Sequence, residues 1–455
     1  MKSVSILGLC LTGAAFVAAP VSFASTYNKD IAPIVYEKCT RCHRAGETAP
    51  FPLTSYEDVA KRGRLIAAVT ASRYMPPWKA EPASFEYADS RRLTDAQLAL
   101  IQEWVKQGMP RGEGATPALP KFPEGWQLGT PDLVVEMPKA FSVPAEGPDI
   151  YRNFVIPLDL KQDEWVQAIE LRPSSQGVVH HVLFFADTSG DARKLETDNM
   201  SEAQGMRFTR GMTQMGGVAV GAQPHLLPDG LALSLPKGSD LVFQYHFHPS
   251  GKAETEKSKI GLYFAKQAPA HTLTNIQLPP AFGLFSNVKI PAGQKEFKIS
   301  DSYVLPVDVE AISVGAHAHY LGKTMKLTAT LPGGAVKTLL RIQDWDFAWQ
   351  DRYFFEQPVS LPKGTRLDAE VTWDNSEGNS RNPSHPPIAV KWGEESKDEM
   401  GSVGLQVYPK AESDLKILTS DFRKHLRDIA VPRLMSDKEL RNWVQQRIPG
   451  GVGGQ

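Results

Sequence analysis

Three short segments of this chain each contain two histidines, and all three have the composition of β-strands. Residues i and i+2 of a strand point to the same face, so the segment HAH can present two imidazoles to one metal ion. Adjacent histidines point to opposite faces of a flat strand, so VVHHVLFF needs a twist or a bulge before both rings converge. Neutral imidazole suits copper or zinc. The pairs are His180 and His181, His246 and His248, and His317 and His319.

A second kind of metal chemistry is indicated by the segment CTRCH near the N-terminus. It contains Cys39, Cys42 and His43, and the only other cysteine of the chain is Cys10. This spacing is the attachment signature of one covalently bound c-type haem, with His43 as an axial iron ligand. A short disulfide loop beside an unrelated histidine is the alternative. The prolines of RYMPPW hold an extended backbone, and we expect Met75 there to be the second axial ligand rather than a core methionine.

Residues 1–24 have the composition of a secretory signal peptide: Lys2, an apolar run, and small residues before an expected cleavage after Ala24. No other segment approaches the ~20 apolar residues of a membrane span. We therefore expect a periplasmic or secreted protein without stable membrane insertion. The 50 basic and 51 acidic residues nearly cancel, which gives no support for a nucleic-acid partner.

The elements that would position these residues change in type along the chain. Helical patterns occupy 55–69 and 94–108, the second opening with a capping box of Thr94 and Gln97. From residue 130 onward, short strands alternate with turn signals, and no long helical period interrupts them. We therefore predict a multidomain fold: a small all-α cytochrome c domain, then two all-β antiparallel sandwich domains that bind copper, then a short C-terminal helix.

The domain boundaries follow from these changes and from a stretch rich in proline and glycine. The predicted divisions are a signal peptide at 1–24, a cytochrome c domain at 26–112, a linker at 113–129, a first copper sandwich at 130–285, a second at 286–410 and a helical tail at 411–455.

The order of the histidine segments resembles that of the copper type II, ascorbate-dependent monooxygenases, which include peptidylglycine α-hydroxylating and dopamine β-monooxygenases. The resemblance covers about residues 130–410 and is carried by VVHHVLFF, LVFQYHFHPSG, GAHAHYLGKTMKL and VKWGEESKDEMG. Sequence alone leaves His248 as an alternative to His246, and a core methionine as the alternative interpretation of Met400. What the resemblance implies is one copper on His180, His181 and His246 and another on His317, His319 and Met400.

The chemistry that the resemblance implies is hydroxylation of a C–H bond of a small organic substrate by O₂, with one oxygen atom going to water. In the family, the copper with the methionine ligand binds O₂, and the copper with three histidines stores an electron. The animal enzymes draw electrons from ascorbate, whereas this chain carries its own haem signature. We expect the haem to pass electrons to the two copper ions from an external donor, either a periplasmic cytochrome or a small reductant.

The sequence departs from the family at the substrate. The peptide-hydroxylating member has an arginine two residues before the first histidine of this motif, where this chain has Gly315. That member also has polar groups at two positions after the methionine ligand, where this chain has Ser402 and Gly404. The grip on a peptide carboxylate is therefore missing, and a glycine-extended peptide is not the expected substrate. A small amine, an aromatic or an aliphatic compound remains open.

Two other classes of protein use the same ligands. One is a non-catalytic periplasmic haem and copper protein for electron transfer or copper binding, and the other is a redox sensor or binding module. A copper-storage protein is expected to carry many soft ligands, and no further clusters of cysteine or methionine occur here. The motif order therefore favours the monooxygenase.

Overall fold

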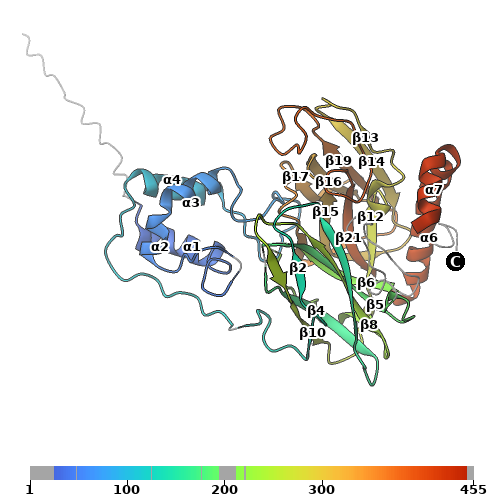
Figure 1. The fold of residues 1–455 in the computed structure, drawn as a ribbon, viewed down its shortest axis with the longest axis horizontal. Coiled ribbons are helices and arrows are strands. Elements are labelled where there is room, and N and C mark those ends of the chain that lie inside the picture. Colours follow the sequence, from blue (N-terminus) through green and yellow to red (C-terminus); the bar gives the residue numbers. More distant parts are fainter. Residues whose placement is uncertain are drawn as a thin grey trace, which may run out of the picture.

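The computed structural model describes residues 25–47, 49–123, 125–175, 177–193, 212–219 and 222–447. The predicted signal peptide lies outside these residues. Two β-sandwiches make up most of the described chain, with the N-terminal region on one side of them and two helices along the opposite edge (Figure 1). Over the described residues, no helix is both long and apolar enough to cross a membrane.

The first sandwich extends from residue 133 to residue 272. Its strands are β1 (Leu133–Glu136), β2 (Phe141–Val143), β3 (Ile150–Pro157), β4 (Glu164–Arg172), β5 (Val179–Asp187), β6 (Met212–Ala219), β7 (Leu231–Leu235), β8 (Asp240–Phe247), β9 (Glu254–Glu256), β10 (Lys259–Phe264) and β11 (His271–Thr272). One sheet has the order β1-β10-β4-β7-β11, and the other has the order β3-β8-β5-β6. Apolar residues from both sheets, among them Val182, Phe243 and Ile260, fill the core between them.

The second sandwich begins with β12, which pairs with β21 and places the boundary near residue 273 rather than 285. Its strands are β12 (Thr274–Leu278), β13 (Lys289–Ile290), β14 (Phe297–Val304), β15 (Val309–Ala318), β16 (Gly322–Thr330), β17 (Val336–Ile342), β18 (Arg352–Leu361), β19 (Arg366–Trp373), β20 (Val390–Lys391) and β21 (Gly401–Pro409), with the 3-10 turn η2 (Ala281–Gly283). Its two main sheets have the orders β12-β21-β15-β18 and β14-β19-β16-β17.

The fold-class prediction is wrong for the N-terminal region, which is not an all-α cytochrome c domain. Its elements are the π-helical turn η1 (Tyr27–Ile31) and the helices α1 (Ala32–Lys38), α2 (Tyr56–Lys61), α3 (Gly63–Ala71) and α4 (Asp95–Lys106). The predicted capping box at Thr94 and Gln97 does begin α4. Between α3 and α4, however, Trp78 and Ala80 belong to the core of the second sandwich, and Tyr87 bridges Phe355.

The reason for this error is that helical periodicity reports only a local preference. Helices of 6 to 12 residues are stable only where their apolar faces pack, so tertiary contacts decide where such a region belongs. The described protein is a mostly β structure in which the N-terminal region is partly built onto the second sandwich.

The C-terminal helix is also longer than the prediction of a short helix. After the 3-10 turn η3 (Glu412–Asp414), helix α6 (Leu415–Ser436) has 22 residues and is followed by α7 (Lys438–Arg447). Leu418 is part of the core of the second sandwich, and Tyr303 of β14 donates a hydrogen bond to Asp421 at 3.0 Å. These contacts fix α6 along the side of the second sandwich (Figure 1).

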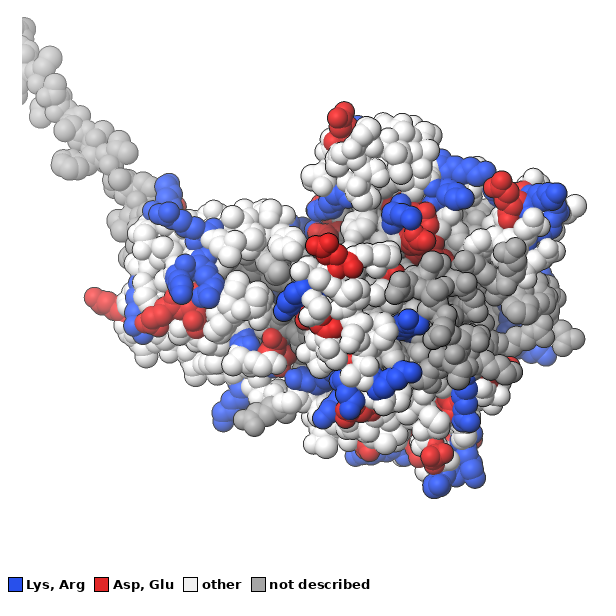
Figure 2. Space-filling model, in the orientation of Figure 1, with Lys and Arg blue, Asp and Glu red and all other residues white. Residues whose placement is uncertain are grey.

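Charged side chains of both signs alternate over the face of the molecule seen in Figure 2. No large area of one sign covers that face, in keeping with the formal net charge of −1.

Candidate metal centres

The adjacent histidines of the first sandwich converge because of a β-bulge. Val179 pairs with Phe247 and His181 pairs with His246, so the ladder between β5 and β8 shifts register at His180. The extra residue of a bulge rotates the strand locally, which brings two consecutive side chains toward one side. His180, His181 and His246 thereby form a cluster in which one ring nitrogen from each histidine lies within 4.8 Å of the other two.

The spacing of the ring nitrogens in this cluster fits one metal ion. The Nδ1 atoms of His180 and His181 are 3.1 Å apart, and those of His181 and His246 are 3.4 Å apart. Two imidazole nitrogens on one tetrahedral ion, each at about 2.0–2.1 Å from the metal, lie about 3.3 Å from each other. The three Nδ1 atoms are therefore the nitrogens that would hold a metal here.

Asp149, just before β3, determines which histidine of the HFH segment belongs to this cluster. One carboxylate oxygen lies 3.0 Å from His246 Nε2, and the other lies 2.7 Å from His248 Nδ1. A carboxylate on the outer nitrogen of a ligand histidine fixes the ring and leaves its other nitrogen for the metal. His246 is buried in the cluster, whereas the side chain of His248 is 52% exposed and holds Asp149 from outside.

The second histidine pair occupies the end of β15. His317 and His319 have ring centroids 5.2 Å apart. His317 Nδ1 lies 2.6 Å from Gln350 Oε1, and His319 Nδ1 lies 3.0 Å from the Asp398 carbonyl oxygen. Since both partners are acceptors, each ring carries its proton on Nδ1, and each Nε2 is left as the nitrogen for a metal.

Met400 directly precedes β21 and lines the same cavity as His317 and His319. Its thioether is a soft ligand that suits Cu(I). The preceding Glu399 is fully buried, although it ends the charged segment EESKDE. Its carboxylate accepts hydrogen bonds from the backbone amides of His319 and Leu321 and from Trp373 Nε1, which fixes the chain between the second histidine pair and Met400.

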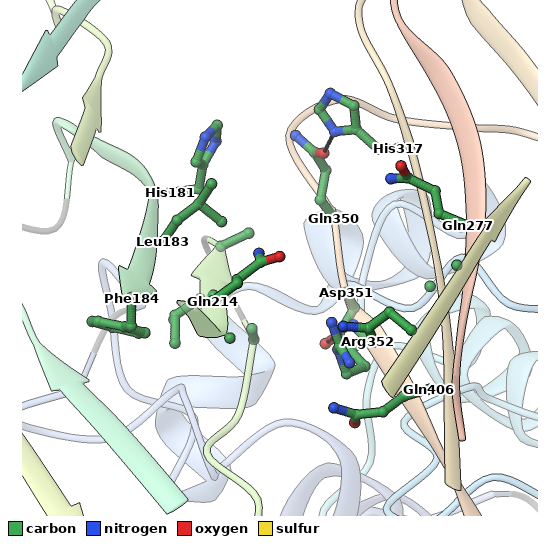
Figure 3. Close-up of a pocket in the computed structure, with 18 of the residues that line it drawn as sticks. His181, Leu183, Phe184, Gln214, Gln277, His317, Gln350, Asp351, Arg352 and Gln406 are labelled. Atoms are coloured by element: carbon green, nitrogen blue, oxygen red, sulfur yellow. Dashed lines mark hydrogen bonds between the residues drawn. The ribbon is translucent and has the colours of Figure 1, made fainter. Parts of the chain in front are cut away.

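The two sets face one cavity of about 610 Å³ between the sandwiches. In Figure 3, His181 and His317 stand on opposite walls of this cavity. Phe347 lies between the sets, with its ring centroid 4.4 Å from that of His180 and 5.4 Å from that of His319. The volume is in the range of small-molecule sites.

Burial keeps the imidazoles of His180, His181, His317 and His319 neutral at neutral pH by lowering their pKa values. Burial lowers the pKa of His180 to about 3, with the neighbouring His246 adding to the effect. Burial likewise lowers the pKa of His317 to about 4, against the hydrogen bond with Gln350. The pKa values of His181 and His319 fall well below the usual value for the same first cause. Neutral rings have the lone pairs that a metal requires.

The CTRCH residues follow α1. Cys39 and Cys42 are not joined by a disulfide in this structure. His43 Nδ1 lies 3.0 Å from the Phe51 carbonyl oxygen, an arrangement that leaves Nε2 as the nitrogen for an iron ligand. The three donors thus fit a haem attached at this turn. Met75 follows α3, half-buried, and its role as the second axial ligand stays a prediction.

Three of the remaining histidines are engaged by acidic side chains. His225 lies 3.9 Å from Asp89, His271 lies 4.0 Å from Glu412, and His425 lies 3.0 Å from Asp301. Only His225 among these lines the cavity, where its ring stacks on Phe354. The sequence did not single out Asp149, Gln350, Phe347 or Glu399. None of these has a motif spacing that points to the site, except that Glu399 adjoins Met400.

No family model matches this sequence, and no curated protein matches it. Among solved structures, PNGF-II matches with 9% identity and a TM-score of 0.27 over 61% of this chain and 65% of that chain. A peptide-N(4)-(N-acetyl-β-D-glucosaminyl) asparagine amidase matches with 10% identity and a TM-score of 0.29, over 61% and 97%. The major capsid protein P2 from bacteriophage PM2 matches with 9% identity and a TM-score of 0.23, over 61% and 97%. TM-scores this low carry no functional inference.

Proposed function

We propose that this protein is an exported, copper-dependent monooxygenase that hydroxylates a C–H bond of a small organic substrate with O₂ and receives its electrons through a c-type haem. The observation that carries the proposal is the meeting of two unlike histidine sets on opposite walls of one cavity, the second beside a methionine. The resemblance of the four motifs to copper type II monooxygenases supports it.

The two sets would have different tasks because their surroundings differ. Copper, when bound, would supply O₂ activation at the set with the thioether and electron storage at the set with three nitrogens. Asp149 holds His246 for the storage site, and Gln350 and the Asp398 carbonyl orient His317 and His319 for the other. Met400 would favour the reduced state of the copper that it binds.

The net reaction balances only with an electron source. Substrate R–H, O₂, two electrons and two protons give R–OH and water. The cavity between the sandwiches would hold the substrate, and Phe347 occupies the space between the two sets. The electrons would come one at a time through the haem at Cys39, Cys42 and His43, from an external cytochrome or a small reductant.

Contacts of the N-terminal region support electron delivery to the cavity from this side. Gln223, which lines the cavity, has its Nε2 atom 3.7 Å from Cys42 Sγ. Tyr74, next to Met75, has its ring centroid 5.7 Å from that of Trp349, which directly precedes Gln350. The turn of CTRCH therefore adjoins one wall of the cavity, and the chain beyond α3 adjoins the segment that orients His317.

The first experiment tests the reaction class. Mature protein loaded with copper and haem is incubated with reductant and ¹⁸O₂ together with metabolite extract, and products are searched by mass spectrometry. We expect a product that contains one ¹⁸O atom, absent with His317→Ala. Reduced protein that consumes no O₂ with any substrate fraction would instead support the non-catalytic electron-transfer alternative.

The second experiment tests the haem. The mass of denatured wild-type protein should retain the haem, and the Cys39→Ala, Cys42→Ala double variant should lack it. The double variant should still bind copper, but its copper should be reduced slowly by a cytochrome donor in stopped-flow measurements. Equal turnover of both proteins with that donor would rule out the haem as the electron inlet.

A further inference from the structure

One wall of the cavity is the face of the sheet β12-β21-β15-β18, and a row of four residues crosses it. Gln277 of β12 pairs with Gly404 of β21, Gly404 pairs with Gly315 of β15, and Gly315 pairs with Arg352 of β18. All four line the cavity. Directly paired residues share a face of the sheet. The side chains of Gln277 and Arg352 therefore flank a gap formed by the two glycines.

The two glycines leave open space in the cavity wall. A β-carbon built on Gly404 meets nothing within 4 Å, and one built on Gly315 meets only backbone at 3.5 Å and beyond. Neither glycine has a positive φ, so the backbone does not require glycine here. His317 lies two residues beyond Gly315 on the same face, about 6.8 Å along the strand. The gap is therefore a trough that ends beside the second histidine set.

Arg352 closes the trough on one side. Its guanidinium is attracted by the neighbouring Asp351 carboxylate but forms no side-chain hydrogen bond or close ion pair among the described residues. Asp351, which also lines the cavity, is paired with Arg91 from the N-terminal region. The other acidic lining residue, Glu394, lies beside Tyr151, which donates to its backbone oxygen. Figure 3 shows Arg352 on the wall that carries His317 and Gln406, facing the wall with His181 and Gln214.

We propose that Arg352 binds a carboxylate of the substrate, and that the Gly315 and Gly404 trough holds the chain leading from that carboxylate to the carbon that reacts. This inference rests on the proposed function and names its substrate class: a small monocarboxylate. Its reactive C–H bond would lie about 8 Å from the carboxylate, because His317 is one strand spacing from Arg352 across the sheet and two residues further along β15.

The charge of the site favours a monocarboxylate over a phosphate. Arg352 is the only lysine or arginine among the described lining residues, so it matches one negative charge. Its planar group can donate two parallel hydrogen bonds to a carboxylate. Phe347, Phe354, Leu233 and Met215 give the rest of the cavity an apolar surface suited to a hydrocarbon or aromatic body.

The test compares matched acids and amides. The probes are phenylacetate and 3-phenylpropanoate with their neutral amides, titrated by calorimetry into the full mature chain without O₂. Each acid should bind wild type about tenfold to a hundredfold more tightly than its amide, because one charge-assisted pair is lost in the amide. Arg352→Gln should remove this preference, and Arg352→Lys should keep part of it. Arg423→Gln, on the exposed surface of α6, is the control with the same charge change and should bind as wild type does.

A second variant tests the trough. Gly404→Leu fills it without a clash in the sheet, so both acid and amide should bind more weakly by similar factors, with the acid preference intact. Equal affinity of acid and amide for wild type, absence of saturable binding by any acid, or an unchanged preference in Arg352→Gln would each overturn the proposal.

Repeating the titrations after copper is removed by a chelator separates this inference from the proposed function. An acid preference that disappears with copper would mean that the metal, not Arg352, binds the carboxylate, and would overturn the inference. Acid binding through Arg352 without any ¹⁸O incorporation would leave the anchor standing and refute the monooxygenase.

Discussion

Both sets consist of imidazole rings, but they differ in which ring nitrogen is left for a metal. In the first set a bulge in β5 turns His180 and His181 together, and three Nδ1 atoms converge at 3.1 and 3.4 Å. In the second set Nδ1 of both histidines is hydrogen-bonded, so the Nε2 atoms are left as the nitrogens for a metal. The first set is assembled by strand geometry, whereas the second depends on side chains from separate segments.

The largest expected effect is that of His181→Ala. The variant should lose the metal of the first set, lowering copper from two ions to one per chain, and turnover should fall to background since electron storage is lost. Copper content and O₂ consumption are the measurements. His248→Ala is the matched control, because the His248 side chain is half-exposed and pairs with Asp149 at the edge of the same cluster. If His248→Ala also lost one copper, the assignment of His246 as the third ligand would be wrong.

Met400→Leu should break the second site while leaving the first intact. The exchange nearly conserves volume, so folding should change by less than about 1.5 kcal/mol. The copper of the first set should remain, and O₂ consumption should be abolished. Met325→Leu changes a buried methionine in the core of the same sandwich, outside the cavity lining, and should keep activity. If Met400→Leu turned over at the wild-type rate, the thioether of Met400 would have no role in the reaction.

Gln350→Leu tests whether the second set depends on its hydrogen bond to Gln350. Loss of an outer partner of a ligand histidine typically weakens metal binding by about 10-fold to 100-fold. Copper affinity of the second set should fall by that factor and that of the first set should not change. Gln406→Leu is the control, because this lining glutamine accepts a hydrogen bond from Ser313 and, within the described residues, has no hydrogen bond to a histidine of either set. Equal losses at both sites would show that they are not separately supported.

The smallest expected effect concerns pH and the segment that carries Gln350. The Arg381 guanidinium, with Lys79, lowers the pKa of Asp344 to about 2. Because the folded value is below the unfolded value of about 3.9, this carboxylate stabilises the fold above pH ~4, and the effect disappears as the pH falls toward 2. Asp344 is half-exposed, so the effect should be at most about 1 kcal/mol. Chemical unfolding of copper-free wild type and Asp344→Asn should show a stability gap at neutral pH that closes over this range.

Asp346→Asn is the control for that measurement, since its carboxylate lies 3.7 Å from both Lys79 and Arg381. The difference in unfolding free energy between wild type and Asp346→Asn should be smaller than that between wild type and Asp344→Asn. A gap between wild type and Asp344→Asn that widens as the pH falls would contradict the assigned direction.

The sequence predicted the histidine pairs and the need for a bulge because strand periodicity determines where consecutive side chains point. It did not predict Asp149, Gln350 or Phe347, because each approaches its histidine from a segment remote in sequence. The N-terminal region was mispredicted as an all-α domain because Trp78, between two helical patterns, packs on a β core that no local pattern indicates.

The most direct test of the account is copper X-ray absorption on reduced, copper-loaded protein, with copper counted on the same samples. Wild type should contain two copper ions per chain and show one sulfur neighbour for every two copper ions, an average of about one half per copper, alongside nitrogen ligands. Met400→Leu should lose the sulfur signal and keep the nitrogen signal of the first set. A single copper per chain, or a spectrum without sulfur in wild type, would contradict the claim that the two histidine sets form two different copper sites.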